Sequence, residues 1–262
     1  MSQKDEQIAI QLIEVEKSFG RQQVLRRINL EVREGRTTVI VGASGTGKSL
    51  ILKHMLGLIR PDQGQVLVFG RDLAKITRKE LKKIRMNFGV LFQNAALFDS
   101  LTVYDNVALP LRERSSMAEE EIRTKVMEKL ALMDLEGAED KYPAQLSGGM
   151  RKRAGLARAL VLNPKVIFFD EPTTGLDVNK ANEIYRLFYE TQTRLNYTAV
   201  IVSHDVPKIL KLADYVAMLA EGVIQDCLTP EAFQISDNPI IRDYVEETMG
   251  PIYKSEREEY TL

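Results

Sequence analysis

Eight consecutive residues have the types and the spacing of a loop that binds phosphate. They match the pattern G-x-x-x-x-G-K-[ST], and they are Gly42, Ala43, Ser44, Gly45, Thr46, Gly47, Lys48 and Ser49. Glycines let backbone amides close around phosphate oxygens, the Lys48 ammonium adds a positive charge, and the Ser49 hydroxyl can ligate Mg²⁺. The pattern predicts a site for a nucleoside triphosphate together with Mg²⁺.

Two adjacent carboxylates, Asp170 and Glu171, follow the apolar run 166–169. A run without alternation predicts a strand buried on both faces, and ligands of open α/β sheets bind beyond the carboxyl ends of such strands. Neighbouring residues of a strand point to opposite sides, so we expect two different roles. Asp170 is predicted to lie beside Mg²⁺, and Glu171 to polarise the attacking water as a general base.

The elements that must position these residues predict an α/β fold. The β-branched run 37–41 is typical of a central strand, and a helix-like pattern begins at Ser49, so the phosphate loop has the strand–loop–helix context that it requires. Alternating patterns within 8–35 and 62–92 predict an additional antiparallel β subdomain.

A second anion site is predicted at Ser147, Gly148 and Gly149. Ser147 stands where an N-cap belongs, in front of a helix-like stretch that runs from Gly148 to about Leu162. The serine hydroxyl, the glycine amides and the helix dipole together favour a bound anion. A single chain does not need two sites for the same γ-phosphate.

These motifs resemble those of the ATP-binding subunits of ATP-binding-cassette (ABC) transporters, and the resemblance covers roughly residues 8 to 228. Further matches are Gln93, Arg153, Arg158, Gly175, Leu176, Asp177 and His204. The resemblance implies an α/β P-loop NTPase core with an antiparallel β subdomain and an α-helical subdomain. It also implies that two copies pair head to tail, so that the signature of each chain covers the ATP of the other. The residues that would then act in trans are Ser147, Gly148, Gly149 and Asp177.

The resemblance assigns roles to three more residues. It makes His204 the switch histidine that contacts the γ-phosphate, and Gln93 a residue that touches Mg²⁺ or the attacking water. Phe19 resembles the aromatic residue that stacks on adenine, and a Phe packed in the core is the open alternative. His54, the other histidine, is expected to pack or to lie at the surface without a catalytic role.

Met150 stands where the family signature usually has Gln, and this departure points to one branch of the family. Runs 146–159, 92–113 and 202–207 resemble Mla-type (maintenance of lipid asymmetry) ATPases, which serve lipid transporters with MCE-domain proteins. The resemblance implies ATP hydrolysis that powers phospholipid transport between the inner and outer membrane. The implied partners are a second copy of the chain, an integral-membrane permease and an MCE-domain protein, and a small STAS-type subunit stays open. The implied location is cytoplasmic, peripheral on the inner membrane through the permease.

Two other functions stay open. One is the ATPase of an importer for an amino acid or another small solute. The other is an ABC-type ATPase that acts on DNA or ribosomes, although the sequence has neither a coiled-coil insertion nor a second cassette. The formal net charge of −1 removes the main electrostatic argument for binding nucleic acid.

Composition and local signals set the expected organisation. No run approaches 18 apolar residues, and residues 1–7 lack the regions of a signal peptide, so we expect the chain to stay where it is made. The single cysteine, Cys227, excludes an intrachain disulfide. We expect an ABC ATPase domain at 1–235, with the helical subdomain inserted at about 94–162, and a C-terminal extension at 236–262. Capping boxes are predicted at 77–80 and 116–119, N-caps at Thr229 and Asn238, and a closing hairpin at 215–227.

Two apolar groups are predicted to meet partners. One is predicted to line a groove for a cytoplasmic helix of the permease, unless it only packs the helical subdomain: Leu97, Phe98, Leu101, Val103 and Tyr104. The other is predicted to clasp the second ATPase subunit, unless the tail is frayed: Tyr244, Val245, Met249, Ile252 and Tyr253.

Overall fold

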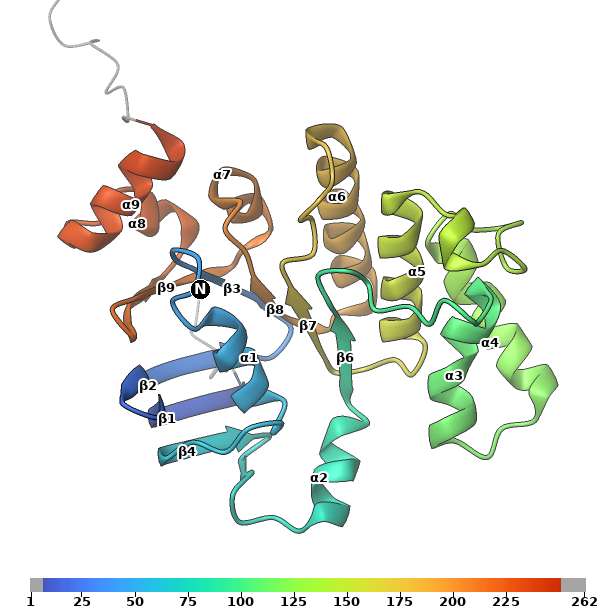
Figure 1. The fold of residues 1–262 in the computed structure, drawn as a ribbon, viewed down its shortest axis with the longest axis horizontal. Helices are drawn as coiled ribbons and strands as arrows, with labels where there is room; N and C mark the ends of the chain where they lie inside the picture. Colours follow the sequence, from blue (N-terminus) through green and yellow to red (C-terminus); the bar gives the residue numbers. More distant parts are fainter. Residues whose placement is uncertain (1–6, 251–262) are drawn as a thin grey trace, which may run out of the picture.

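The computed structural model describes residues 7–250, which form two sheets with helices packed between and around them (Figure 1). The first sheet is antiparallel and has the order β2-β1-β4-β5. Its strands are β1 (Ile8–Phe19), β2 (Gln22–Arg33), β4 (Gln63–Val68) and β5 (Arg71–Asp72). The predicted antiparallel subdomain is therefore confirmed.

The second sheet has the order β10-β9-β3-β8-β7-β6 and is parallel from β9 to β6. Its strands are β3 (Thr37–Val41), β6 (Phe88–Leu91), β7 (Val166–Asp170), β8 (Thr198–Val202), β9 (Tyr215–Ala220) and β10 (Val223–Leu228). The antiparallel pair β9 and β10 confirms the predicted closing hairpin. The assignment of residues up to 92 to the antiparallel subdomain was wrong, because β6 pairs with β7 instead. A short apolar run does not specify which sheet will take it.

The helices pack on the parallel sheet and, in the helical subdomain, on one another. They are α1 (Lys48–Met55), α2 (Arg78–Arg85), α3 (Val103–Arg114), α4 (Glu119–Leu132), α5 (Gly148–Leu160), α6 (Val178–Leu195), α7 (Val206–Ile209), α8 (Pro230–Gln234) and α9 (Pro239–Met249). Short 3₁₀ turns occur at Pro143–Gln145 and Leu210–Leu212. In Figure 1, α3 and α4 lie on the side of α5 away from the sheet, and these three helices form the helical subdomain.

The core is divided in two by the parallel sheet, because successive side chains of a strand point to opposite faces. Phe168 belongs to the cluster that α1 and the antiparallel sheet share, whereas Phe169 belongs to the cluster under the other helices. Both phenylalanines are fully buried. This arrangement explains why the strands leading to the predicted site lack alternation: each face is covered by its own layer.

Local signals were mostly, but not always, sufficient to find the helix ends. Thr77 and Glu80 form the predicted reciprocal capping box of α2, and Thr229 and Asn238 cap α8 and α9. The capping box predicted at 116–119 was wrong, because α4 begins after Ala118, which makes no side-chain cap. Ser116 lies two residues too early to reach the free amides of that helix.

The C-terminal helix α9 packs on the chain's own core. Ile241 and Val245 are 0% and 1% exposed, and Tyr244 and Met249 pack against the same cluster. The prediction that Val245, Tyr244 and Met249 form a free surface for a second subunit was therefore wrong. Ile252 and Tyr253 lie outside the described residues. Within residues 7–250, no helix is both long and apolar enough to cross a membrane.

Candidate functional site

The phosphate loop follows β3 directly and ends at the first turn of α1. Gly47 is the N-cap of α1 with a φ of 108°. Gly42 has a φ of 147°, and a Cβ atom there would lie 2.2 Å from the backbone oxygen of Leu219 in β9. Neither position tolerates a side chain, so these glycines are required by the backbone as well as by the phosphate. Inside the loop, the Thr46 hydroxyl donates to the Ala43 carbonyl over 2.9 Å.

Lys48 is buried beneath this loop. Its Nζ atom donates to the carbonyl oxygens of Gly42 and Ala43, each over 2.8 Å. Burial lowers the pKa of Lys48, and the nearby charges of Glu171 and Asp170 act in the opposite direction. The ammonium group is thus held within the loop, among groups of opposite charge.

Ser49 and Asp170 meet across the carboxyl ends of β3 and β7. The Ser49 hydroxyl donates to Asp170 Oδ1 over 2.9 Å, although the two residues are 121 positions apart in the chain. A hydroxyl and a carboxylate on the same side of the loop provide the oxygen ligands that Mg²⁺ prefers. The structure thus brings together two residues that the sequence assigned separately to Mg²⁺.

Glu171 lies one residue beyond β7, in the left-handed region with a φ of 49°. Its amide donates to the Val202 carbonyl over 3.0 Å, and its Oε2 atom lies 2.7 Å from His204 Nδ1. Glu171 was expected within the strand, but β7 ends at Asp170, so strand alternation does not apply to it. The two carboxylates nevertheless have different partners, Ser49 for Asp170 and His204 for Glu171. Left-handed backbone in a non-glycine residue is strained and concentrates at functional sites.

An open cavity of about 370 Å³ brings the predicted residues together. It is lined by Ser44, Gly45, Gly47, Lys48, Ser49, Leu50, Gln93, Glu171, Thr174 and His204. Thr174 was missed in the sequence, although it directly precedes the Gly175-Leu176-Asp177 motif. Its hydroxyl oxygen is buried and has no hydrogen-bond partner among the described residues.

Phe19 lies at the end of β1 and is 54% exposed. The alternative that it packs in the core is therefore excluded. The Nζ atom of Lys17 lies 5.7 Å from the centroid of its ring. An exposed ring of this kind can stack on a planar base.

The signature residues do not line this cavity. Ser147 is the N-cap of α5, and its hydroxyl accepts from the Met150 amide over 3.2 Å. Gly148 and Gly149 form the first turn of α5, and Asp177 is the N-cap of α6. Ser147 and Asp177 are exposed, Gly148 and Gly149 are half-buried, and none of the four lines the cavity at the phosphate loop of the same chain.

Helix α5 is fastened to the segment that carries Gln93. The Nζ atom of Lys152 donates to the Gln93 carbonyl, and Arg158 donates over 2.7 Å to each of the carbonyls of Ala95 and Ala96. A Cβ atom on Gly155 would lie only 2.8 Å from a methyl carbon of Leu91, so the helix and the segment touch closely. Lys152 has no ion pair among residues 7–250, and burial lowers its pKa to about 8, with the charge of Arg151 adding to the shift. Signature and Gln93 therefore belong to one packed unit.

An apolar groove of about 560 Å³ lies between α1, α2, β6, α3 and α5. It is lined by Leu56, Leu58, Arg85, Phe88, Gly89, Val90, Phe92, Ala96, Phe98, Leu109, Pro110, Arg114, Arg158, Ala159 and Leu162. Of the five residues predicted to form such a groove, only Phe98 lines it. Val103 is fully buried, and Leu97 and Tyr104 pack against the core, so for these three the alternative of packing holds.

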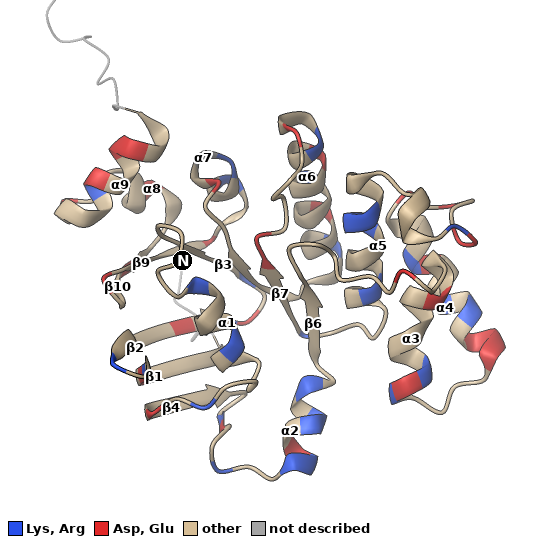
Figure 2. Ribbon diagram, in the orientation of Figure 1, with Lys and Arg blue, Asp and Glu red and all other residues tan. Residues whose placement is uncertain are grey.

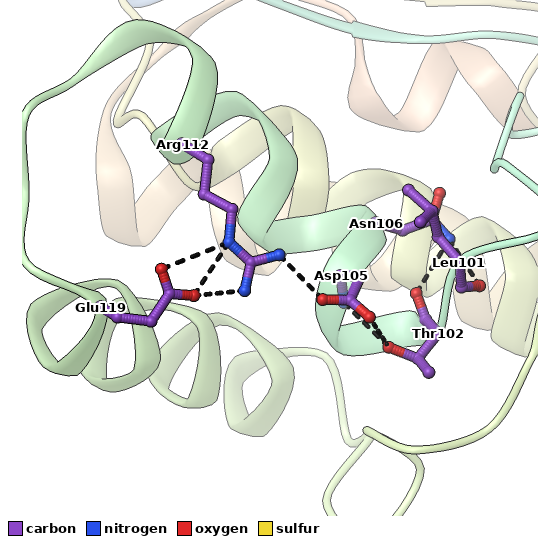
Figure 3. Close-up of polar contacts among 6 residues, drawn as sticks. All are labelled: Leu101, Thr102, Asp105, Asn106, Arg112 and Glu119. Carbon is purple, nitrogen blue, oxygen red and sulfur yellow. Dashed lines mark hydrogen bonds and ion pairs between the residues drawn. The ribbon is translucent and has the colours of Figure 1, made fainter.

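Asn106 fixes the loop that presents Phe98. Its buried amide group accepts from the Phe98 amide over 2.8 Å and donates to the carbonyls of Phe98, Leu101 and Thr102 over 2.9–3.1 Å. Figure 3 shows Asn106 with Leu101 and Thr102 at the start of α3, and Arg112, which bridges Asp105 and Glu119. These hydrogen bonds hold the loop in a position that leaves the Phe98 side chain 53% exposed.

Comparisons with known proteins agree with this geometry. Residues 25–174 match the family model for the ABC transporter. The intermembrane phospholipid transport system ATP-binding protein MlaF of Haemophilus influenzae is 39% identical over 89% of this chain and 89% of its own. The protein of Mycobacterium leprae named "Probable ribonucleotide transport ATP-binding protein mkl" is 42% identical over 96% of this chain and 73% of its own.

Solved structures give the same result. CbiO1 from Clostridium perfringens, part of the ABC transporter complex cbiONQ, has a TM-score of 0.80 at 30% identity and covers 91% of this chain and 94% of its own. The dimeric ATP-binding cassette MJ0796 bound to ADP and Pi has a TM-score of 0.76 at 32% identity and covers 84% of this chain and 98% of its own.

Proposed function

Since the chain belongs to the ABC transporter family, and therefore hydrolyses ATP, we propose that it powers a permease that moves phospholipid between the inner and outer membrane. The carrying observation is the 39% identity to an intermembrane phospholipid transport ATPase over 89% of both chains. The relative named for ribonucleotide transport favours a second candidate, a transporter of a small solute. The charges do not favour a role on nucleic acid. Figure 2 shows Lys and Arg on α2 and Asp and Glu at the start of α4, so the surface is mixed in charge and not uniformly basic.

We assign ATP to the cavity at the phosphate loop. The loop amides and Lys48 would hold the β- and γ-phosphates, and the exposed ring of Phe19 would stack on adenine. Ser49, Asp170 and Gln93 would hold Mg²⁺, since their side chains offer hydroxyl, carboxylate and amide oxygens to one region. When bound, Mg²⁺ would neutralise charge that develops on the phosphates.

Glu171 is our candidate for the general base. Its carboxylate would accept a proton from the attacking water, and the hydrogen bond to His204 Nδ1 would hold it in place. His204 would then contact the γ-phosphate through its free ring nitrogen, and Gln93 would orient the water. These roles explain why two residues 33 positions apart are joined at the edge of the cavity.

Each cavity is proposed to be completed by a second copy of the chain. Ser147, Gly148, Gly149 and Asp177 lie outside the cavity of their own chain, and the N-terminus of α5 is suited to an anion. The dimeric state of the MJ0796 cassette with ADP and Pi supports this arrangement. ATP would close the dimer, and hydrolysis would reopen it.

The groove around Phe98 is proposed to receive a cytoplasmic helix of the permease. Its wall is apolar, it carries three arginines, and no carboxylate lines it in the described part of the chain. The matching helix would therefore be apolar with an acidic residue at its edge. Through this contact the chain would lie on the cytoplasmic side of the inner membrane. An MCE-domain protein, and a small STAS-type subunit, would complete the transporter.

The domain boundaries are kept as a proposal, with an ATPase domain at 1–235, its helical part at about 94–162, and an extension at 236–262. Because α9 packs on its own chain, a clasp between subunits would have to come from residues after 250. Ending the chain after Gly250 should then weaken assembly without nucleotide and leave the melting temperature unchanged. Unchanged assembly would exclude the clasp.

The transport proposal is tested on the complex that co-purifies with the chain from a detergent extract. We expect a permease in that complex, phospholipid bound to it by mass spectrometry, and ATP-dependent movement of labelled phospholipid in proteoliposomes. Movement of a ribonucleotide or another small solute, without phospholipid, would establish the second candidate. Recovery of no membrane protein would reject both.

A further inference from the structure

Helix α9 packs against an element that carries the proposed chemistry. Its residues Ile241 and Val245 share one buried cluster with Val206 and Ile209 of α7. Helix α7 begins two residues after His204, so α9 supports the segment that holds this histidine. A C-terminal helix that was expected to serve only assembly therefore touches the catalytic region.

Tyr244 extends this contact to the phosphate loop. The Gly42 amide donates a hydrogen bond to the Tyr244 hydroxyl over 3.2 Å, across 202 positions of the chain. Gly42 is the first residue after β3 and the first residue of the loop. Burial raises the pKa of Tyr244 to about 12, and the charge of Glu171 adds to this shift, so the hydroxyl stays neutral at physiological pH.

Three contacts restrict the backbone at Gly42. Its amide bonds to Tyr244, and its carbonyl accepts from Lys48 Nζ over 2.8 Å. The backbone oxygen of Leu219 leaves no room for even a Cβ atom at Gly42. The amide belongs to the Val41–Gly42 peptide and the carbonyl to the Gly42–Ala43 peptide, so the two bonds fix both peptides that flank the Gly42 Cα atom. The Tyr244 bond holds the first of these peptides, and the second sets where Lys48 starts, because Lys48 must leave this carbonyl to reach a phosphate.

We propose that Tyr244 is a positioning residue for ATP binding, which holds the first peptide of the phosphate loop in place from the C-terminal helix. The inference rests on the proposed role of the loop and of Lys48. The ring of Tyr244 packs against the core, and a phenylalanine would keep that packing. The hydroxyl contributes the contact with Gly42, which makes Tyr244→Phe the defining substitution.

The experiment compares Tyr244→Phe with a matched control, Tyr197→Phe. Tyr197 is 2% exposed, and its hydroxyl lies 2.9 Å from Thr191 Oγ1. It precedes β8 at the amino end of the parallel strands, whereas the phosphate loop follows the carboxyl end of β3. Both variants lose one buried tyrosine hydroxyl. The full-length variants are assayed for direct binding of Mg-ATP, for KM and kcat of ATP hydrolysis, and for melting temperature. Lys48→Ala serves as the reference for a lost phosphate site.

We expect Tyr244→Phe to raise the Kd and KM for ATP about three- to tenfold, the range of one lost hydrogen bond, with a smaller change in kcat. Tyr197→Phe should lower the melting temperature and leave both constants unchanged. Unaltered ATP binding in Tyr244→Phe, or the same change in both variants, would overturn the inference. If Lys48→Ala also bound ATP normally, the assignment of the loop itself would fail, which separates the two outcomes.

Discussion

His204 Nδ1 and Glu171 Oε2 lie 2.7 Å apart and join the segments that follow β8 and β7. Glu171 is only 18% exposed in its side chain, whereas His204 is 62% exposed and faces the open side of the cavity. The Glu171 side chain is thus mostly buried, whereas the His204 side chain is accessible to solvent. A carboxylate that is oriented by an imidazole is a suitable acceptor for a proton from water.

Replacing Glu171 with Gln should abolish hydrolysis and preserve ATP binding, because the amide keeps the shape but cannot accept the proton. We expect kcat to fall about 100-fold or more. The dimer should then accumulate in the closed state, which size-exclusion chromatography with ATP would detect. Glu171→Gln protein with near-normal turnover in the assembled complex would remove Glu171 from this role.

Replacing Ser147 with Arg should block hydrolysis while leaving ATP binding to the isolated chain almost unchanged, because Ser147 is proposed to contact the partner's nucleotide and not its own. Mixing this variant with Lys48→Ala restores one composite site in each mixed dimer. Part of the ATPase activity should return on mixing if one site can act alone. Loss of ATP binding by isolated Ser147→Arg chains would contradict the assignment in trans.

Replacing Phe98 with Asp should detach the permease, because an exposed ring in the groove becomes a charge. The melting temperature should change little, as expected for surface substitutions. Tyr189→Asp is the matched control: Tyr189 is 57% exposed on α6 and does not line the groove. In Phe98→Asp, but not in Tyr189→Asp, the recovery of the permease by affinity purification should fall by roughly tenfold or more, as for the loss of a central interface residue. A sharp loss of stability in Phe98→Asp would instead assign Phe98 to packing.

His54 should make stability depend on pH. The ring is fully buried, its Nδ1 atom lies 2.8 Å from the Leu50 carbonyl, and Nε2 has no partner among the described residues. Burial lowers the pKa of His54 against the opposing effect of the Leu50 bond, while the charge of Lys17 lowers it further and that of Asp62 raises it.

Because the folded pKa lies below the unfolded value of about 6.5, the unfolded chain binds the extra proton first. The free energy of unfolding should therefore fall as pH drops below about 6.5, with a slope of at most about 1.4 kcal/mol per pH unit from this group. Urea unfolding at pH 8, 7, 6 and 5.5 measures it. His54→Leu should flatten this part of the curve. Equal slopes in wild type and His54→Leu would reject the prediction.

The sequence predicted the residues of the phosphate site because their chemistry depends on short-range spacing. Lys48 and Ser49 follow the glycines directly, and Asp170 ends an apolar strand that can only be central. Short-range spacing does not predict tertiary contacts. Neither the left-handed backbone of Glu171 nor the approach of Tyr244 to Gly42 follows from local pattern, since both depend on elements far along the chain. Val103 and Val245 were misassigned for a related reason: an apolar residue looks the same whether it faces a partner or its own core.

The attachment of α5 to the Gln93 segment links two sites within each subunit. Lys152 and Arg158 bind backbone carbonyls of the segment 93–96, and the same helix begins at Ser147, where the partner's nucleotide is proposed to bind. A displacement of Gln93 at its own ATP would thus move the residue that is proposed to contact the other nucleotide. The state of one nucleotide in a dimer would then influence the other. Replacing Lys152 or Arg158 should weaken this coupling, so that the two sites hydrolyse ATP independently.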